Sequence, residues 1–372
     1  MTESNAWLSA GTDSILNSLS DGVYITGRDR TILFWNDAAE KLTGWKRSEV
    51  CGRSCFDKIL AHEDKSGLSL CGEDNCPLYR AIASGQGSCC PVIVFGHSSE
   101  GSLIPLQVSV APIRDDKGNI LGGVEVFRDL STLMKDLETA NLIQRQSMTS
   151  ELPIDERIIF AAHNEPYDIV GGDFFRVERL DENSFVIFIA DVMGHGVASA
   201  LYSMQLHSLW ENNRSILGHT ARVLQNMNKQ LSVLTGENEY FATALHGVLD
   251  VERRVLQLCC AGQPGPLILR NGESFFTETS GIPLGFLPDA EYEVHNIPIN
   301  KGDRILFYTD GATEYLGNEG EKYDSGIFES LAMETRDLPP AAALPTIRNG
   351  LLSRTGRIQL SDDLTLIAAD LL

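Results

Sequence analysis

The sequence predicts an α+β protein with two domains joined by a helix. The chain has 372 residues, and at about 150 residues per domain this length indicates two or three domains. Six of its eight cysteines lie between Cys51 and Cys90, so the two halves differ in composition. A stretch without Gly or Pro, residues 129–152, separates them and ends at Pro153. We therefore expect domains at 10–128 and 153–372, with a helical linker over 129–152.

The composition excludes several classes of protein. Hydrophobic residues make up 43% and charged residues 22%, which are values of a globular chain. Acidic residues outnumber basic ones 51 to 30, and the net charge of −21 argues against nucleic acid or an anionic membrane as partner. No apolar run approaches the roughly 18 residues that span a membrane, and residues 1–10 lack the features of a secretory signal. We expect a cytoplasmic protein with reduced thiols.

The first half is predicted to contain five strands and short helices. Asn36 is placed to cap a helix that runs through Leu42. The turn at 115–119 joins the last two strands as a hairpin. Apolar patterns between turn residues predict strands at 22–26, 31–35, 90–95, 103–113 and 120–129.

This half resembles a PAS domain over about residues 10–130. The resemblance lies in DGVYITGRDRTILFWNDAAEKLTGW near its start and GNILGGVEVFRDLS at its last strand. It implies an antiparallel five-stranded sheet with flanking helices and a small ligand cavity. It also implies that the domain senses a cue or forms a dimer.

The linker is predicted to form a helix of about six turns. Leu130, Leu133, Leu137 and Ala140 recur at helical spacing. Such a helix packs on its own domain or pairs with a second copy in a coiled coil. We expect a homodimer through the PAS domain and this helix.

The second half alternates short apolar strands with glycine turns, a pattern typical of an α+β sandwich. Strands are predicted at 158–163, 184–191, 240–250, 255–261, 266–270, 304–310 and 364–371, and helices at 198–212, 219–234 and 338–353.

Four aspartate motifs stand out in this half. They are GGDFF with Asp173, ADVMGHG with Asp191, YTDGATE with Asp310, and SDDLTL with Asp362 and Asp363. In the last three, the aspartate lies at an end of an apolar strand, where a sheet holds it rigidly. Converging carboxylates repel one another without a cation, and oxygen ligands suit Mg²⁺ or Mn²⁺. The alternative is that each aspartate caps a turn.

The four motifs together resemble those of PPM-type (protein phosphatase 2C-like) serine/threonine phosphatases, of the SpoIIE- and RsbU-like bacterial branch. The resemblance covers about residues 140–372 and includes AGQPGPLILR and GIPLG. It implies an α-β-β-α sandwich that binds two Mn²⁺ or Mg²⁺ ions.

The resemblance also implies roles for individual residues. By position, Asp191 bridges both ions, the carbonyl of Val192 binds the first, and Asp310 and Asp362 hold the second. Asp173 binds the first ion directly or through water, and Asp363 helps a further ion. Asp191, Asp310 and Asp362 are thus the expected catalytic residues.

The implied reaction is hydrolysis of phosphoserine or phosphothreonine by metal-activated water. The expected partner is a phosphorylated STAS-domain antagonist of an anti-sigma factor. The alternative is a non-catalytic pseudophosphatase that binds a phosphoprotein, and the complete aspartate set favours the enzyme. His195 is either a general acid or a residue that fixes its loop. Gln263 departs from the family, which commonly has His there, and Cys259 and Cys260 are expected in the core.

The PAS half carries a second candidate site. Cys55, His62, Cys71 and Cys76 are soft ligands that suit zinc or an iron–sulfur cluster. Two alternatives stay open, a Cys71–Cys76 redox pair and inert buried thiols. The cue or ligand that this domain senses is not evident from the residues.

Overall fold

The structure, a computed structural model, divides into two compact units, Met1–Asp136 and Leu137–Leu372. The division falls inside helix α6 (Ser131–Met148), so the predicted boundaries at 128 and 152 stay predictions. The predicted end of this helix includes residues 149–150, which lie outside the described residues. The structure describes residues 11–57, 59–64, 67–72, 75–88, 91–148, 151–235, 240–317, 320–323, 325–355 and 360–372.

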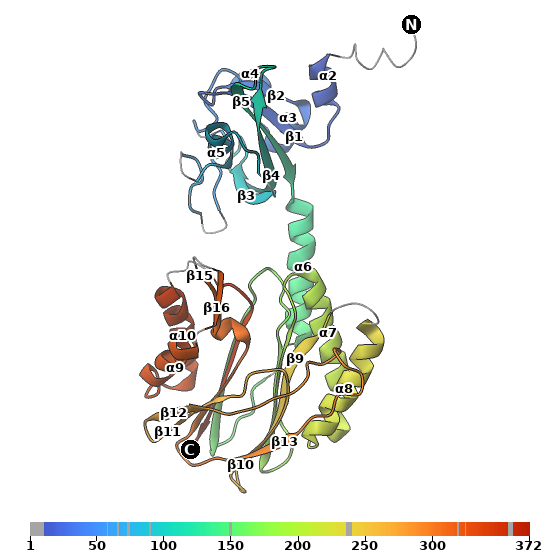
Figure 1. The fold of residues 1–372 in the computed structure, drawn as a ribbon, viewed down its shortest axis with the longest axis vertical. Coiled ribbons are helices and arrows are strands. Elements are labelled where there is room, and N and C mark those ends of the chain that lie inside the picture. The colour runs from blue at the N-terminus through green and yellow to red at the C-terminus, as the bar shows by residue number, and fades with distance from the viewer. Residues whose placement is uncertain are drawn as a thin grey trace. The chain divides into compact units, whose positions relative to one another are not determined.

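The N-terminal unit contains the predicted antiparallel five-stranded sheet, in the order β2-β1-β5-β4-β3 (Figure 1). Asn36 caps α3 as expected, because its side chain accepts a hydrogen bond from the Ala39 N–H at 2.8 Å. The same oxygen accepts from Val23 N–H and so ties the helix to β1. The elements are α2 (Thr12–Asn17), β1 (Gly22–Gly27), β2 (Ile32–Trp35), α3 (Asp37–Thr43), α4 (Arg47–Val50), α5 (Pro77–Ser84), β3 (Val92–His97), β4 (Leu103–Arg114) and β5 (Ile120–Asp129).

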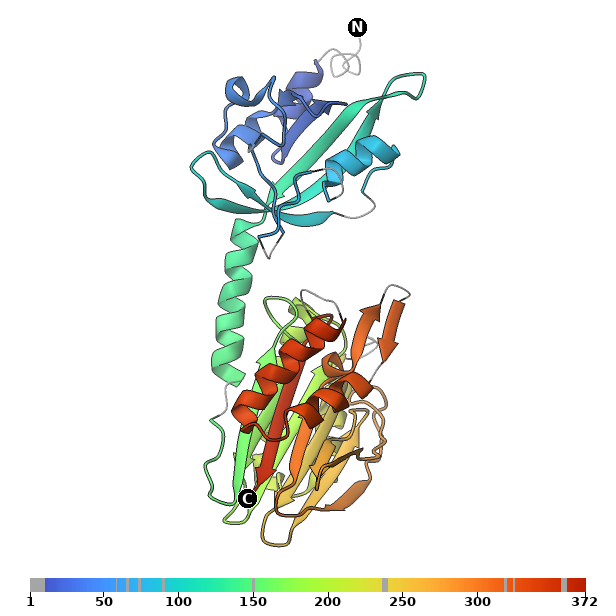
Figure 2. The same cartoon turned by 90° about the vertical axis from the view of Figure 1, so that its left-hand side faces the viewer.

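The C-terminal unit is the predicted α-β-β-α sandwich. Its two main sheets have the strand orders β13-β10-β9-β8-β7 and β12-β11-β14-β17-β6. Helices α7 and α8 cover the first sheet, and α9 and α10 cover the second (Figures 1 and 2). The elements are β6 (Ile158–Glu165), β7 (Phe174–Arg179), β8 (Ser184–Val192), α7 (Val197–Asn212), η1 (Arg214–Ile216), α8 (Thr220–Thr235), β9 (Ala242–Asp250), β10 (Val255–Ala261), β11 (Leu267–Arg270), β12 (Glu273–Phe276), β13 (Val294–Pro298), β14 (Arg304–Tyr308), η2 (Asp310–Ala312), β15 (Glu314–Gly317), β16 (Gly320–Tyr323), α9 (Ser325–Glu334), α10 (Pro340–Thr355) and β17 (Leu364–Leu371).

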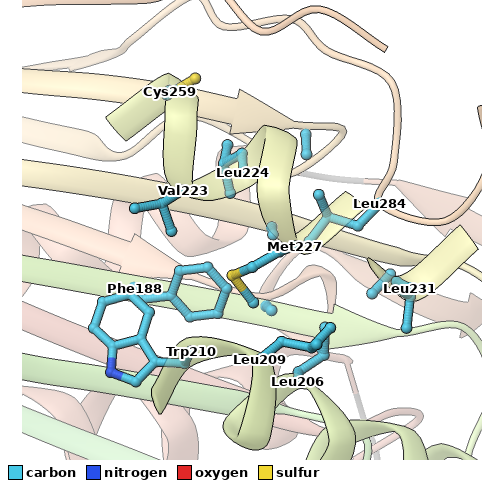
Figure 3. Packing of buried hydrophobic residues seen from close by; sticks show 14 of the residues in the cluster. Phe188, Leu206, Leu209, Trp210, Val223, Leu224, Met227, Leu231, Cys259 and Leu284 are labelled. Carbon is cyan, nitrogen blue, oxygen red and sulfur yellow. The ribbon is translucent and has the colours of Figure 1, made fainter. Parts of the chain in front are cut away.

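Strand β8 shows why its sequence is apolar throughout. Successive strand residues point to opposite faces, and both faces of β8 are covered. Phe188 packs against Trp210 and Met227 under helices α7 and α8 (Figure 3), whereas Ile187 and Ile189 face the second sheet. The adjacent Cys259 and Cys260 of β10 divide between the same two cores and are fully buried, as predicted.

None of the helices within the described ranges combines the length and the apolar character needed to cross a membrane.

Candidate active site

Strand pairing brings the predicted aspartates to one end of the sandwich. In the first sheet, Phe174 of β7 pairs with Ala190 of β8, so Asp173 and Asp191 are neighbours across antiparallel strands. In the second sheet, β14 pairs with β17, so the segments after Tyr308 and before Leu364 meet at one edge. Those segments carry Asp310, Asp362 and Asp363.

Charge effects show that the five carboxyl groups interact. Burial raises the pKa of Asp191 well above its usual range, and the charges of Asp173, Asp310, Asp362 and Asp363 raise it further. Carboxylates that raise one another's pKa favour a bound cation, which removes the repulsion.

Asp173 is buried, with 6% of its surface exposed. Its Oδ2 accepts hydrogen bonds from the hydroxyls of Thr309 (2.9 Å) and Thr365 (2.6 Å), whereas its Oδ1 is buried without a partner. Burial, followed by the charge of Asp363, raises its pKa well above the usual range, although the two hydroxyls act in the opposite direction. The free oxygen is therefore a candidate ligand atom.

Asp310 begins η2, two residues after the end of β14, and its Oδ1 is also buried without a partner. Burial, then the charges of Asp362 and Glu314, raise its pKa to about 7. The next residue must be glycine, because a Cβ on Gly311 would lie 2.1 Å from the carbonyl oxygen of Asp363.

Asp363 has a positioning role that the sequence did not reveal. Its carboxylate accepts hydrogen bonds from the backbone N–H groups of Tyr167 (2.7 Å) and Gly172 (2.5 Å). Gly172 in turn lies against the Val192 carbonyl, which would be 3.0 Å from a Cβ at that position. Asp363 thus holds the loop that carries Asp173 beside the end of β8.

The chemistry of this donor set fits hard divalent cations. Two carboxylate oxygens, on Asp173 and Asp310, are buried without partners, and oxygen donors suit Mg²⁺ or Mn²⁺. In the part of the chain that the structure describes, no group of three or more His, Cys, Asp or Glu side chains is arranged as a metal-binding set. The fit rests on the orphaned oxygens and on the mutual repulsion of the carboxyl groups.

His195 lies on the loop after Asp191 and is largely exposed. Its Nδ1 is 3.0 Å from Oδ2 of Asp168, and its ring meets the edge of Tyr167. Asp168 was not predicted, since it lies in a loop with no motif around it. The pair orients the imidazole at the rim of the carboxylate cluster.

Gln263 forms hydrogen bonds to both sheets. Its side chain donates to the carbonyl of Tyr308 at 2.7 Å and accepts from the hydroxyl of Thr243 at 2.5 Å. Thr243 pairs with Asp191 across β8 and β9. Gln263 therefore links the strand of Asp191 to the strand that leads into Asp310.

Comparison with protein families finds a matching family model for each half of the chain. The family model of Stage II sporulation protein E (SpoIIE) matches residues 181–372, more than half of the chain, and the PAS fold matches residues 12–130. The chain belongs to the SpoIIE family.

Two curated relatives come from Bacillus subtilis (strain 168). Phosphoserine phosphatase RsbP is 28% identical over 184 residues, which are 48% of this chain and 45% of RsbP. Phosphoserine phosphatase RsbU is 26% identical over 239 residues, which are 63% of this chain and 70% of RsbU. The chain thus aligns with less than half the length of RsbP.

Solved structures show the same fold. The RsbU and RsbW domains of Rv1364c from Mycobacterium tuberculosis share 28% identity with a TM-score of 0.53, covering 61% of this chain and 63% of that one. The SiaA-PP2C domain of Pseudomonas aeruginosa shares 21% identity with a TM-score of 0.55, covering 65% and 98%.

Helix α6 also reaches the candidate site of this SpoIIE-family chain. The buried Gln144 donates to the carbonyl of Gly171 (2.7 Å) and to the hydroxyl of Ser203 (2.9 Å). Gly171 lies two residues before Asp173. A cleft of about 420 Å³ between α6 and this loop is lined in part by Arg145 and Asp363. Helical spacing alone did not single out Gln144.

The predicted PAS-domain ligands come together around one small cavity, lined by Cys55, His62, Cys71 and Cys76. Cys71 and Cys76 are free thiols, so the predicted redox pair is not a disulfide in this structure. Cys89 and Cys90 lie outside the described residues.

Proposed function

We propose that this protein is a metal-dependent protein serine/threonine phosphatase whose activity is regulated by its PAS unit. The observation that carries the proposal is the cluster of aspartates at one end of the sandwich, two of which have a buried oxygen without a hydrogen-bond partner. The similarity to RsbP and RsbU, both named phosphoserine phosphatases, supports phosphoserine as the group hydrolysed.

Each residue has a distinct task in this proposal. Two Mn²⁺ or Mg²⁺ ions, when bound, would activate water and neutralise the phosphoryl oxygens. Asp191, Asp310, Asp362 and the Val192 carbonyl would hold these ions, and Asp173 would bind directly or through water. Asp363 fixes the loop of Asp173, and no covalent phosphoenzyme is required.

His195 has two possible tasks in the same reaction. Its pairing with Asp168 suits a general acid that protonates the leaving serine oxygen, provided that the substrate reaches this rim. The pairing equally fixes the loop, so the leaving-group test in the Discussion separates the two roles.

The proposed substrate is a phosphorylated STAS-domain antagonist of an anti-sigma factor, in the cytoplasm. The support is the similarity to RsbU and to a structure that contains RsbU and RsbW domains. We further propose a homodimer formed through the PAS unit and α6. Gln144 gives α6 a direct hydrogen bond to the loop of Asp173, so removal of residues 1–128 should change basal turnover.

The test is hydrolysis of p-nitrophenyl phosphate and of a phosphoserine STAS protein, with Mn²⁺ and with EDTA. We expect Mn²⁺-dependent turnover that Asp191→Ala abolishes. Asp181→Asn is the control, because Asp181 caps the turn before β8, outside the carboxylate cluster. No turnover of either substrate by a folded, Mn²⁺-bound protein would leave two readings, an enzyme that is silent until it receives its signal and the non-catalytic phosphoprotein-binding alternative.

A further inference from the structure

A cavity inside the PAS-fold unit is surrounded by soft metal ligands. Its volume is about 10 Å³, close to the minimum of roughly 10–15 Å³ that holds one water molecule. A space of this size accepts one atom and not a haem, a flavin or an iron–sulfur cluster. Its polar and sulfur lining comes from Cys55, His62, Cys71, Cys76, Tyr24 and Arg30.

Local backbone structure places these ligands around the cavity. Glu63 forms an antiparallel bridge with Ser69, and the Leu70 N–H donates to the His62 carbonyl at 2.8 Å, which brings His62 close to Cys71. Cys76 is the N-cap of α5, with its sulfur accepting from the Tyr79 N–H at 3.5 Å.

Cys55 is held by a different segment of the chain. Its backbone N–H donates to the carbonyl of Arg30 at 3.0 Å, beside the bridge between Thr31 and Ser54. The Arg30 guanidinium donates to the carbonyl of Gly72 at 2.8 Å and thereby links this segment to the segment of Cys71.

A buried imidazole and a buried carboxyl group near the thiols each have one polar atom without a hydrogen-bond partner. His62 is 7% exposed and Glu125 is 1% exposed, and the distance from Nε2 of His62 to Oε1 of Glu125 is 3.6 Å. Neither of these two atoms has a hydrogen-bond partner, and orphaned polar atoms are rare in protein interiors. A histidine that binds a metal commonly presents its other ring nitrogen to a carboxylate, which orients the ring.

We propose that Cys55, Cys71, Cys76 and His62 bind a single transition-metal ion that prefers tetrahedral sulfur and nitrogen ligands, of the Zn²⁺ class. Three thiolates and one imidazole form a Cys₃His set, which is common in structural zinc sites. Such a site carries one net negative charge, and the Arg30 guanidinium at the cavity wall compensates it. Within the described residues no complete metal-binding set is preassembled, so binding would require these side chains to move closer together.

The site is independent of the proposed phosphatase centre and differs from it in chemistry. The aspartates offer oxygen, whereas the PAS cavity offers sulfur and nitrogen. Co²⁺ distinguishes them, because thiolate ligands give an intense sulfur-to-cobalt charge-transfer absorption and oxygen ligands do not.

The experiment uses the full chain, reduced and stripped by a chelator, and titrated with Co²⁺ and then Zn²⁺. We expect the charge-transfer absorption to saturate at one equivalent and to disappear as Zn²⁺ displaces Co²⁺. Cys55→Ser, Cys71→Ser and His62→Gln should weaken or shift it. Cys51→Ser is the matched control, since Cys51 is a free, half-buried thiol of the same unit that does not line the cavity.

The wild-type titration decides the proposal even if a variant fails to fold. Absence of the charge-transfer absorption in the folded, reduced wild-type chain overturns it and leaves inert thiols. Absorption that persists unchanged in both Cys55→Ser and Cys71→Ser also overturns it, because the sulfur ligands would then lie elsewhere.

Discussion

Replacing Thr365 with valine tests whether the hydroxyl of Thr365 stabilises the ionised form of Asp173. Valine keeps the shape of threonine but removes the hydroxyl that donates to Asp173 at 2.6 Å and accepts from Asn164 at 2.7 Å. A hydrogen bond to a charged group contributes about 1.5–3 kcal/mol. Loss of the hydrogen bond from Thr365 raises the pKa of Asp173 further, so a higher cation concentration is needed to ionise Asp173. Since about 1.4 kcal/mol corresponds to a tenfold change in a binding constant, we expect the Mn²⁺ concentration that gives half-maximal activity to rise about 10- to 100-fold.

Initial rates of p-nitrophenyl phosphate hydrolysis against Mn²⁺ concentration measure this effect. Thr335→Val is the matched control, because Thr335 is equally buried in the same unit but donates only to the carbonyls of Leu331 and Ala332. A Mn²⁺ curve for a folded Thr365→Val protein that superimposes on the wild-type curve would refute the reasoning.

Three further predictions follow from single contacts. Gly311→Ala forces a Cβ against the carbonyl of Asp363, so we expect a lower melting temperature and at least a tenfold loss of Mn²⁺-dependent turnover. Gly218→Ala is the control, because a Cβ at Gly218 makes only an ordinary contact, and it should change neither quantity. Equal turnover in the two variants would contradict this prediction. Burial lowers the pKa of His246 to about 4, so between pH 6.5 and pH 4 a proton binds His246 in the unfolded chain but not in the folded one. The free energy of unfolding therefore decreases as the pH falls through this range, by up to about 3 kcal/mol. Urea unfolding of His246→Phe should show a smaller decrease, and a decrease equal to that of the wild type would contradict this prediction. If His195 is the general acid, His195→Gln slows hydrolysis of a phosphoserine peptide more than hydrolysis of p-nitrophenyl phosphate, because the leaving group of p-nitrophenyl phosphate needs no proton. Equal slowing of both reactions would show that His195 supports its loop instead.

The strands with the clearest apolar patterns were predicted best. The predicted ranges for β5, β10 and β17 agree with the structure at both ends, and turn residues precede each of these runs. Strand β13 was missed, since its residues alternate between exposed and half-buried and carry a weak signal. It forms because it pairs with β10 at the sheet edge, from Val255–Pro298 to Cys259–Val294. That pairing depends on a strand distant in the sequence.

In the candidate site, too, local features were predictable from the sequence and contacts between distant segments were not. Asp191, Asp310 and Asp362 were recognisable from their motifs, because an aspartate next to an end of an apolar strand is a local pattern. The partners Thr309 and Thr365 of Asp173 were not, because their hydroxyls reach it across 136 and 192 residues of chain. No local pattern distinguishes a threonine that faces a carboxylate from one that faces the core.

The sequence by itself determined which side chains carry the chemistry, the oxygen donors of the second half and the thiols of the first. It also determined which faces are buried, since the spacing of apolar residues is a local property. Only the tertiary structure decided which strands become neighbours. The pairing of β7 with β8 and of β14 with β17 brings the aspartates together, and the turns around His62 and Cys76 gather the soft ligands at one cavity. Periodicity specifies a buried face but not its partner, which depends on how complete sheets and helices pack.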